Sequence, residues 1–126
     1  MPKKKSEPKP ESTHHELVQV DLNFPRIQSE LEDLEYEQVV DFENCIEKVK
    51  QITWAQILAT SSRSQKRGLN WEVLSDQKTA AGKVIATIRV TGKFRARVTR
   101  DGAFMRFISL HPDHDGAYKE KGQESI

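Results

Sequence analysis

The last third of the chain holds the residue types that bind phosphate and move protons. Arginines recur along residues 95–106, and the stretch LHPDHDGAY at residues 110–118 follows with two histidines, two aspartates and a tyrosine. Arginine offers a planar, permanently charged donor fork that matches phosphate oxygens. Histidine titrates near neutral pH, so it can give or take a proton. These residues predict a site for an anionic ligand next to groups capable of acid/base chemistry.

A hairpin is expected to position the arginines. Asp101-Gly102 separates two alternating runs, which is among the strongest short-range hairpin signals. If these two residues form the turn, directly opposed residues share a face of the sheet. The predicted pairs are Arg100 with Ala103, Val98 with Met105, Arg97 with Arg106, Ala96 with Phe107, and Arg95 with Ile108.

The predicted pairing gives the hairpin one apolar and one cationic face. The apolar face, expected to be core, carries Phe94, Ala96, Val98, Met105 and Phe107. The other face gathers three guanidiniums on a rigid surface, those of Arg95, Arg97 and Arg106. Because opposed like charges repel, such a cluster is easiest to explain if an anionic partner lies on it.

Other catalytic classes have little support. His111, His114 and Asp115 could form a ligand trio, but their spacing matches no strong zinc signature and no cysteine pair accompanies them. No glycine-rich phosphate loop is present, and no cofactor is expected. Cys45 is the single cysteine and lies in a helical pattern, so a packed thiol is expected, with no internal disulfide, in a reducing cytoplasm.

Length, composition and charge indicate one polar globular domain with two electrostatic halves. The 126 residues are 36% hydrophobic and 31% charged, without an apolar run of membrane-spanning length or a secretory signal. Residues 16–60 carry ten acidic against three basic side chains, whereas residues 61–126 carry thirteen basic against seven acidic ones. Either the basic half meets a polyanion or the two halves neutralise each other across their interface.

The expected elements follow from periodicity and turn residues. Residues 1–15 read as a disordered basic tail and residues 119–126 as a second tail. Between them we expect a strand at 16–21, a helix from Pro25 capped by Asn23, a helix at 36–50, a helical piece after Thr53, a polar loop at 60–68, a strand at 69–74, an irregular link at 75–81, and three strands at 82–110. The predicted class is α+β, a small antiparallel sheet packed against an N-terminal helical hairpin.

This order of elements resembles the RelE/ParE superfamily of bacterial toxins from type II toxin–antitoxin systems. The resemblance covers roughly residues 17–118, and we take 16–118 as a RelE/ParE-like domain. It is carried by the helical pair at 25–58, the run GLNWEVL, the strands TIRVTGKFRARVTRDGAFMRFISL and the closing LHPDHDGAY. The resemblance implies a RelE-like fold and a cytoplasmic toxin that forms a hetero-oligomer with a cognate antitoxin. It implies no association with a membrane. Members similar to RelE cut mRNA on the ribosome without a metal and so inhibit translation; members similar to ParE poison DNA gyrase. A non-catalytic relative that binds antitoxin or RNA is the further alternative.

Applied to this sequence, the ribonuclease branch implies a set of site residues. Arg97 and Arg106 would bind the scissile phosphate and Arg95 a neighbouring one, with Lys93 and Arg67 as further RNA contacts. His111 or His114 would act as acid or base, and Tyr118 would orient the phosphate or stack on a base. The alternatives are structural: the histidines would pin the turn at Pro112 through Asp113 or Asp115, Tyr118 would pack the last turn, and residues 60–68 would be an exposed connector. Many members carry a basic residue where this chain has Asp113-His114, which leaves the acid/base assignment open.

Overall fold

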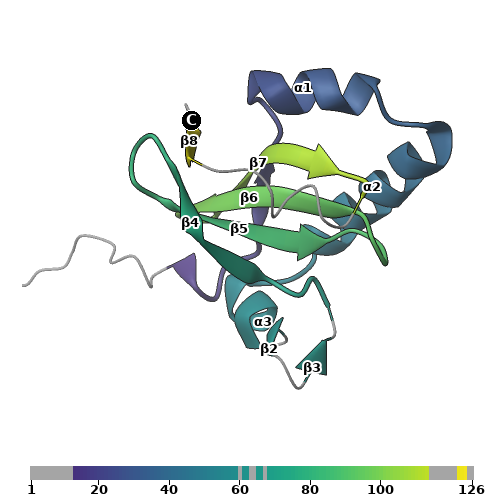
Figure 1. The fold of residues 1–126 in the computed structure, drawn as a ribbon. Helices are drawn as coiled ribbons and strands as arrows, with labels where there is room; N and C mark the ends of the chain where they lie inside the picture. Colours follow the sequence, from purple (N-terminus) through teal and green to yellow (C-terminus); the bar gives the residue numbers. More distant parts are fainter. Residues whose placement is uncertain (1–12, 60, 63–64, 67, 114–121, 125–126) are drawn as a thin grey trace, which may run out of the picture.

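A computed structural model describes residues 13–59, 61–62, 65–66, 68–113 and 122–124 (Figure 1). Within these residues three helices and eight strands follow one another in the order β1, α1, α2, α3, β2 to β8. The helices are α1 (Pro25–Glu32), α2 (Tyr36–Val49) and α3 (Trp54–Ala59). The strands are β1 (Gln19–Asp21), β2 (Ser61–Ser62), β3 (Gln65–Lys66), β4 (Glu72–Thr79), β5 (Val84–Arg89), β6 (Arg95–Asp101), β7 (Phe104–His111) and β8 (Gly122–Glu124).

The main sheet is mixed, which corrects the expectation of an antiparallel one. Its strand order is β1-β7-β6-β5-β4-β8, and the pairs β4–β5, β5–β6 and β6–β7 form the predicted antiparallel meander. The edge strands β1 and β8 pair in parallel with β7 and β4. The α+β class is therefore confirmed, while each parallel edge pair joins two strands that are far apart in sequence, β1 with β7 and β4 with β8.

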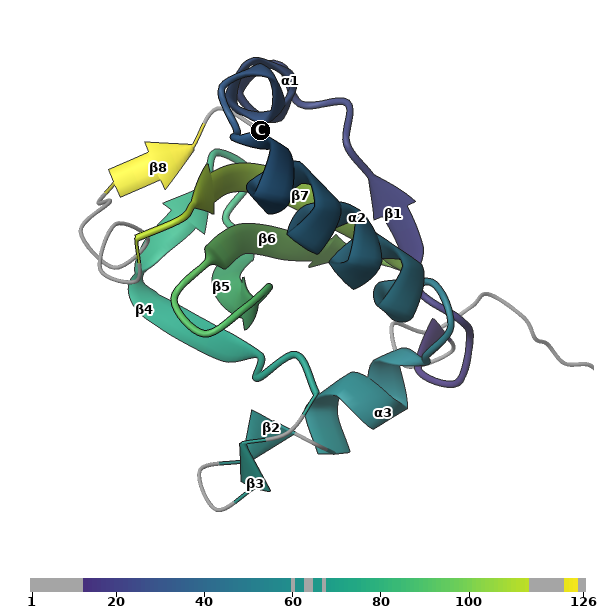
Figure 2. The same cartoon turned by 90° about the vertical axis from the view of Figure 1, so that its right-hand side faces the viewer.

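Helix α2 covers one face of the sheet and forms the core with it (Figure 2). Its buried residues Phe42, Cys45 and Val49 recur at helical spacing, and the ring of Phe42 meets Phe107 of β7 edge to face, with centroids 5.5 Å apart. A capping box between Glu35 and Gln38 starts the helix. We call the sheet face against α2 the helical face. It carries Phe94, Ala96, Val98, Met105 and Phe107, all buried, as predicted.

Helix α3 is anchored to the β6–β7 hairpin by Trp54. The indole Nε1 donates a 3.0 Å hydrogen bond to the carbonyl of Ala103, and the ring meets Trp71 edge to face at 5.3 Å. The guanidinium of Arg100 lies 4.5 Å from the Trp54 ring centroid, within cation–π range. Burial lowers the pKa of Arg100 from its usual value.

The predicted register of the hairpin was wrong by two residues. Asp101 pairs with Phe104, so the loop is Gly102-Ala103, with Gly102 at a φ of 62° that favours glycine. An even shift keeps the same side chains on each face near the turn, but it sets Arg106 opposite Thr99 and no longer opposite Arg97. The expected repulsion between those two arginines is therefore removed.

Several boundaries also differ from the expectation. The N-cap of α1 is Phe24, not Asn23, and no side chain caps it. The hydroxyl of Thr13 accepts a hydrogen bond from Arg100, so contacts with the domain extend before the predicted boundary at residue 16. Strand β4 runs through the expected link at 75–81, the short strands β2 and β3 pair within the expected loop, and β8 lies in the expected tail.

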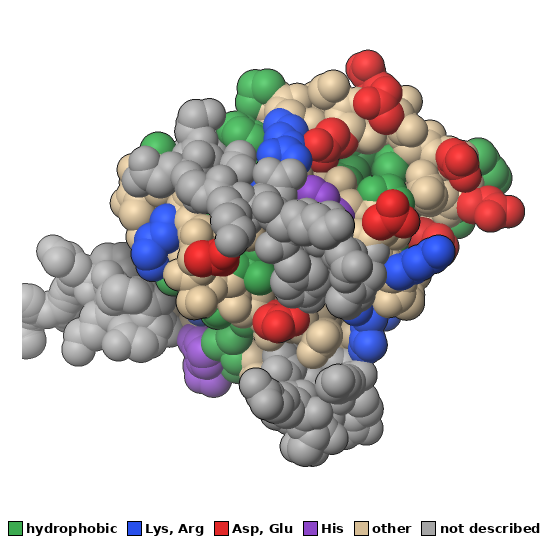
Figure 3. Space-filling view, viewed as in Figure 1, with side chains coloured by type: hydrophobic (Ala, Val, Ile, Leu, Met, Phe, Trp, Pro, Cys, Tyr) green, Lys and Arg blue, Asp and Glu red, His purple; other side chains and the backbone are tan. Residues whose placement is uncertain are grey.

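Acidic side chains gather over α1 and α2. Figure 3 shows them at the upper right, where Figure 1 has these helices, with apolar side chains among them. No helix within the described ranges is both long and apolar enough to cross a membrane.

Candidate functional site

A β-bulge in β7 decides which side chains share a face with the arginines. The register shifts between Val98, paired with Phe107, and Arg97, paired with Ser109, so that Ile108 is the extra residue. Without the bulge, strict alternation would turn Ser109 and His111 toward the helical face. With it, both lie on the opposite face beside Arg95 and Arg97. We call this second face the polar face.

Four buried side chains on the polar face form a hydrogen-bonded chain. Arg97, fully buried at 0% exposure, donates from Nε to Oε1 of Gln77 at 2.8 Å and from Nη1 to Oγ of Ser109 at 3.0 Å. The Ser109 Oγ lies 2.7 Å from Nε2 of His111, which is 9% exposed. We call this chain of Gln77, Arg97, Ser109 and His111 the polar network.

The donors and acceptors of the network allow a proton direction that runs from Arg97 through Ser109 to His111. A guanidinium can only donate, so Ser109 Oγ accepts from Arg97. Its hydroxyl hydrogen can then be donated to Nε2 of His111, which leaves the imidazole proton on Nδ1. Arg97 thereby acts on His111 through Ser109, and it orients the imidazole at the end of β7.

The guanidinium of Arg95 bonds mainly to the turn between β5 and β6. Its Nη1 donates to the carbonyls of Thr91 at 2.9 Å and Gly92 at 3.0 Å, and its exposure is 7%. Its Nε is buried without a hydrogen-bond partner in the part of the chain that the structure describes. Arg95 pairs with His111 in the sheet, and Lys93 in the adjoining turn is exposed. This end of the sheet therefore holds Arg95 on the strand beside His111, with Lys93 in the turn that adjoins Arg95.

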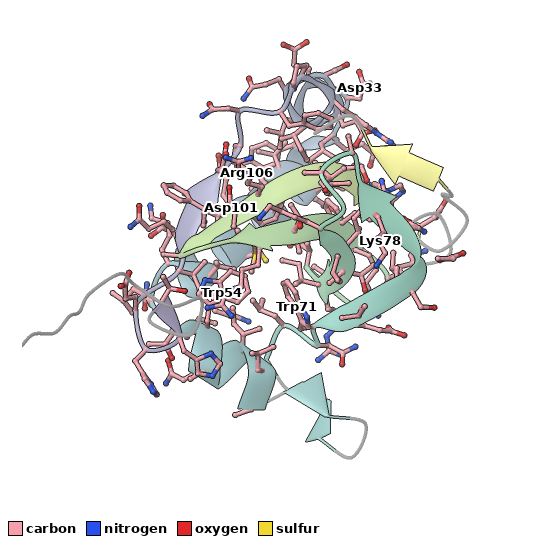
Figure 4. The ribbon with its side chains drawn as sticks, turned by 90° about the vertical axis from the view of Figure 1, so that its left-hand side faces the viewer. Asp33, Trp54, Trp71, Lys78, Asp101 and Arg106 are labelled. Atoms are coloured by element: carbon pink, nitrogen blue, oxygen red, sulfur yellow. The ribbon has the colours of Figure 1, made fainter. Side chains whose placement is uncertain are left out.

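Arg106 lies apart from the polar network, toward the other end of β7. Figure 4 labels it beside Asp101, and its Nη2 is 3.1 Å from Oδ2 of that residue. Its Nε is 3.1 Å from Oδ2 of Asp21, at an angle that does not suit a hydrogen bond, so we treat this contact as ionic. Two carboxylates thus balance the charge of Arg106, which is the most exposed of the three arginines.

The predicted site residues are only partly brought together. Arg95, Arg97 and His111 are neighbours, whereas Arg106 is separate and the expected open surface of three guanidiniums is not found, because Arg95 and Arg97 are buried. His114, Tyr118 and Arg67 lie outside the described residues. Within the described part, no group of three or more His, Cys, Asp or Glu side chains is arranged to hold a metal ion.

Two members of the polar network were missed in the sequence. Ser109 follows the apolar pair Phe107-Ile108, and that break in alternation is the local signal of a bulge. Gln77 is 1% exposed because the register of β4 is irregular between Leu74 and Lys78. Nothing in the alternation of residues 72–79 indicates that irregularity.

Comparison of the chain with protein-family models, curated proteins and solved structures found no match. The resemblance to the RelE/ParE superfamily therefore rests on the order of elements and on the residues of the last third.

Proposed function

We propose that this chain is a RelE/ParE-like toxin that cleaves mRNA on the ribosome. The proposal is supported by the order of a strand, helices and an antiparallel meander, in which the first strand lies next to the last strand of the meander. A RelE-like fold, a cognate antitoxin and a ribosomal substrate are parts of the same proposal. The observation that carries it is the β7 bulge, because it sets His111 beside Arg95 and links it through Ser109 to the buried Arg97.

The roles proposed for the residues follow from their contacts. His111 is the proton-transfer group, since its imidazole lies at the edge of the buried network. Arg97 and Ser109 position it, and Arg95 and Lys93 supply positive charge for phosphate binding at the adjoining turn. His114 and Tyr118 are proposed to complete the site, and Arg67 to contact RNA nearby. Arg106 is assigned a lesser part because two carboxylates balance it.

The proposed reaction uses the RNA's own hydroxyl and needs no metal. A base removes the proton of the 2′-hydroxyl, and the 2′-oxygen forms a bond to phosphorus. Cationic donors stabilise the crowded phosphate, and the bond from phosphorus to the 5′-oxygen breaks as an acid protonates that oxygen. The products are a 2′,3′-cyclic phosphate and a free 5′-hydroxyl.

Cleavage of translated message tests this proposal. The chain is induced in bacteria and the 5′ ends of mRNA are mapped; the purified chain is then incubated with programmed ribosomes and the chemistry of the new RNA ends is determined. We expect cuts within translated regions that leave a 2′,3′-cyclic phosphate and a 5′-hydroxyl. The variant His111→Gln places an amide group near the position of Nε2 that can form hydrogen bonds but transfers no proton, so cleavage should fall about 100-fold or more. The matched control is His15→Gln, at an exposed histidine before β1.

A non-catalytic RelE/ParE-like protein, including one that poisons gyrase, is the second candidate. The burial of Arg95 and Arg97 favours it, because a phosphodiester needs exposed donors. Growth arrest with an SOS response and intact message would support gyrase as the target. Intact message with normal growth would leave a binding protein whose polar face holds an acidic, apolar antitoxin segment. Either result excludes the nuclease.

A further inference from the structure

An apolar groove runs along α2 on the helical side of the molecule. One hollow of about 590 Å³ lies between α1 and α2, with Leu31 and Val39 in its lining, and a second of about 660 Å³ lies between β1 and α2, with Val20 in its lining. Leu22 and Ile46 line both hollows, so the two lie next to each other. All five side chains are half-buried. We call this surface the β1–α2 groove; in Figure 2 α2 crosses in front of the sheet, with α1 above it and β1 at its right.

The free edge of β1 offers little to an added strand. Gln19 N–H bonds to the Ala103 carbonyl on the β7 side, so the backbone groups of Val20 point to the outer edge. On either side of Val20 that edge is already engaged: Val18 N–H bonds to the Ile52 carbonyl, and the Leu22 carbonyl accepts from Gln28. Strand addition would therefore gain few hydrogen bonds, and the groove favours an occupant that binds by its side chains.

The charges around the groove determine the sign of that occupant. Glu43 and Glu47 lie in its lining, and Lys50 at one end is 3.5 Å from Glu47. The segment 16–60 that forms the groove has a net charge of −7. A second copy that docked through this same surface would present its own acidic helices to it and be repelled.

We propose that the β1–α2 groove binds an amphipathic helix of a partner protein whose polar face carries lysine and arginine. Aliphatic side chains at positions i, i+3 or i+4, and i+7 of that helix enter the two hollows. Its basic side chains lie over Glu43 and Glu47. This site is on the other side of the sheet from the polar network, and its partner is opposite in charge to an antitoxin segment on the polar face.

Two synthetic helices with one shared apolar face test the proposal. One has leucines at helical spacing and lysines on its polar face, and the other has glutamates in place of the lysines. Binding to the full chain is measured by fluorescence anisotropy, and the contacted residues are mapped by amide NMR shifts. We expect the lysine helix to bind at least about tenfold more tightly, with an advantage that shrinks in salt. The shifts should centre on Leu22, Val39 and Ile46.

Charge reversal in the protein provides the matched control. The double variant Glu43→Lys with Glu47→Lys should weaken the lysine helix about tenfold or more and strengthen the glutamate helix. Asp76→Lys, at an exposed position on β4, should change neither affinity by more than about twofold. Equal binding of the two helices, or shifts outside the groove, would overturn the proposal. So would concentration-dependent dimerisation that shifts the groove residues, since it would make a second copy the occupant.

Discussion

Nε2 of His111 lies 2.7 Å from Oγ of Ser109, two residues earlier in the same strand. Residues two apart in a strand share a face, so this bond needs no special backbone turn. What it needs is the bulge at Ile108, which directs both side chains toward Arg97 on β6. A local irregularity in one strand thus joins an imidazole to a buried guanidinium.

Replacing Ser109 by alanine should destabilise the fold and release His111. The change removes the acceptor of Arg97 Nη1 inside the sheet, and a buried charged donor without that acceptor costs about 1–3 kcal/mol. Urea unfolding measures the loss. The control is Ser75→Ala, at an exposed position on β4, which should stay within about 0.5 kcal/mol of the parent. Nitrogen NMR of His111 should also change, because Nε2 loses its hydroxyl partner. An unchanged free energy of unfolding would show that Ser109 does not satisfy Arg97.

Trp54→Phe should cost more stability than its lost volume suggests. Phenylalanine keeps a ring in the core but cannot donate to the Ala103 carbonyl, 3.0 Å from Nε1, and it makes a weaker contact with Arg100. We expect a loss of about 1–3 kcal/mol in urea unfolding. Trp71→Phe is the comparison, since Trp71 is only half-buried and should lose less. Equal losses in the two variants would contradict a special role for the indole N–H.

Removing the charge of Asp101 should lower the free energy of unfolding only slightly. Its carboxylate is 3.4 Å from Lys83 Nζ and 3.1 Å from Arg106 Nη2, but all three side chains are about 39–45% exposed. Exposed ion pairs contribute about 0–1 kcal/mol. The free energy of unfolding of Asp101→Asn in urea should therefore fall by less than about 1 kcal/mol, and by less still in about 0.5 M salt. A loss above about 2 kcal/mol would mean that these ion pairs hold the hairpin together.

The helices α2 and α3 and the antiparallel meander were predictable because their signals lie in residues close together in the sequence. Apolar spacing located α2, the threonine at 53 correctly indicated the start of α3 by sharing hydrogen bonds with Gln56, and turn residues located the meander. Strand β8 carries no such signal: the residues Gly122-Gln123-Glu124 pair with β4 only because the chain returns to that edge. The parallel position of β1 is likewise decided by tertiary contacts.

The face of the arginines on β6 could be predicted from the sequence, but the positions of the β7 residues that follow the bulge could not. Alternation correctly put Arg95 and Arg97 on the face opposite Phe107, but it could not report that the polar face is buried around them. Ile108 reverses the alternation of everything that follows in β7, so the place of His111 depends on one inserted residue. Gln77 depends in the same way on the irregular register of β4.

Cys45 should make stability fall at alkaline pH. Burial raises the pKa of its thiol to about 11, against the opposing charge of Lys48, while the unfolded thiol titrates near 9.0. The folded state therefore holds this proton more tightly, and the stabilisation, complete below pH 9, is lost as the pH rises toward 11. Between pH 8 and 10 the parent should lose about 1 kcal/mol more than Cys45→Ala, whose own cavity cost does not depend on pH. Urea unfolding of both proteins at pH 8, 9 and 10 measures the difference. If the free energy of unfolding changed with pH equally in the two proteins, the thiol would ionise as easily in the folded core as in the unfolded chain.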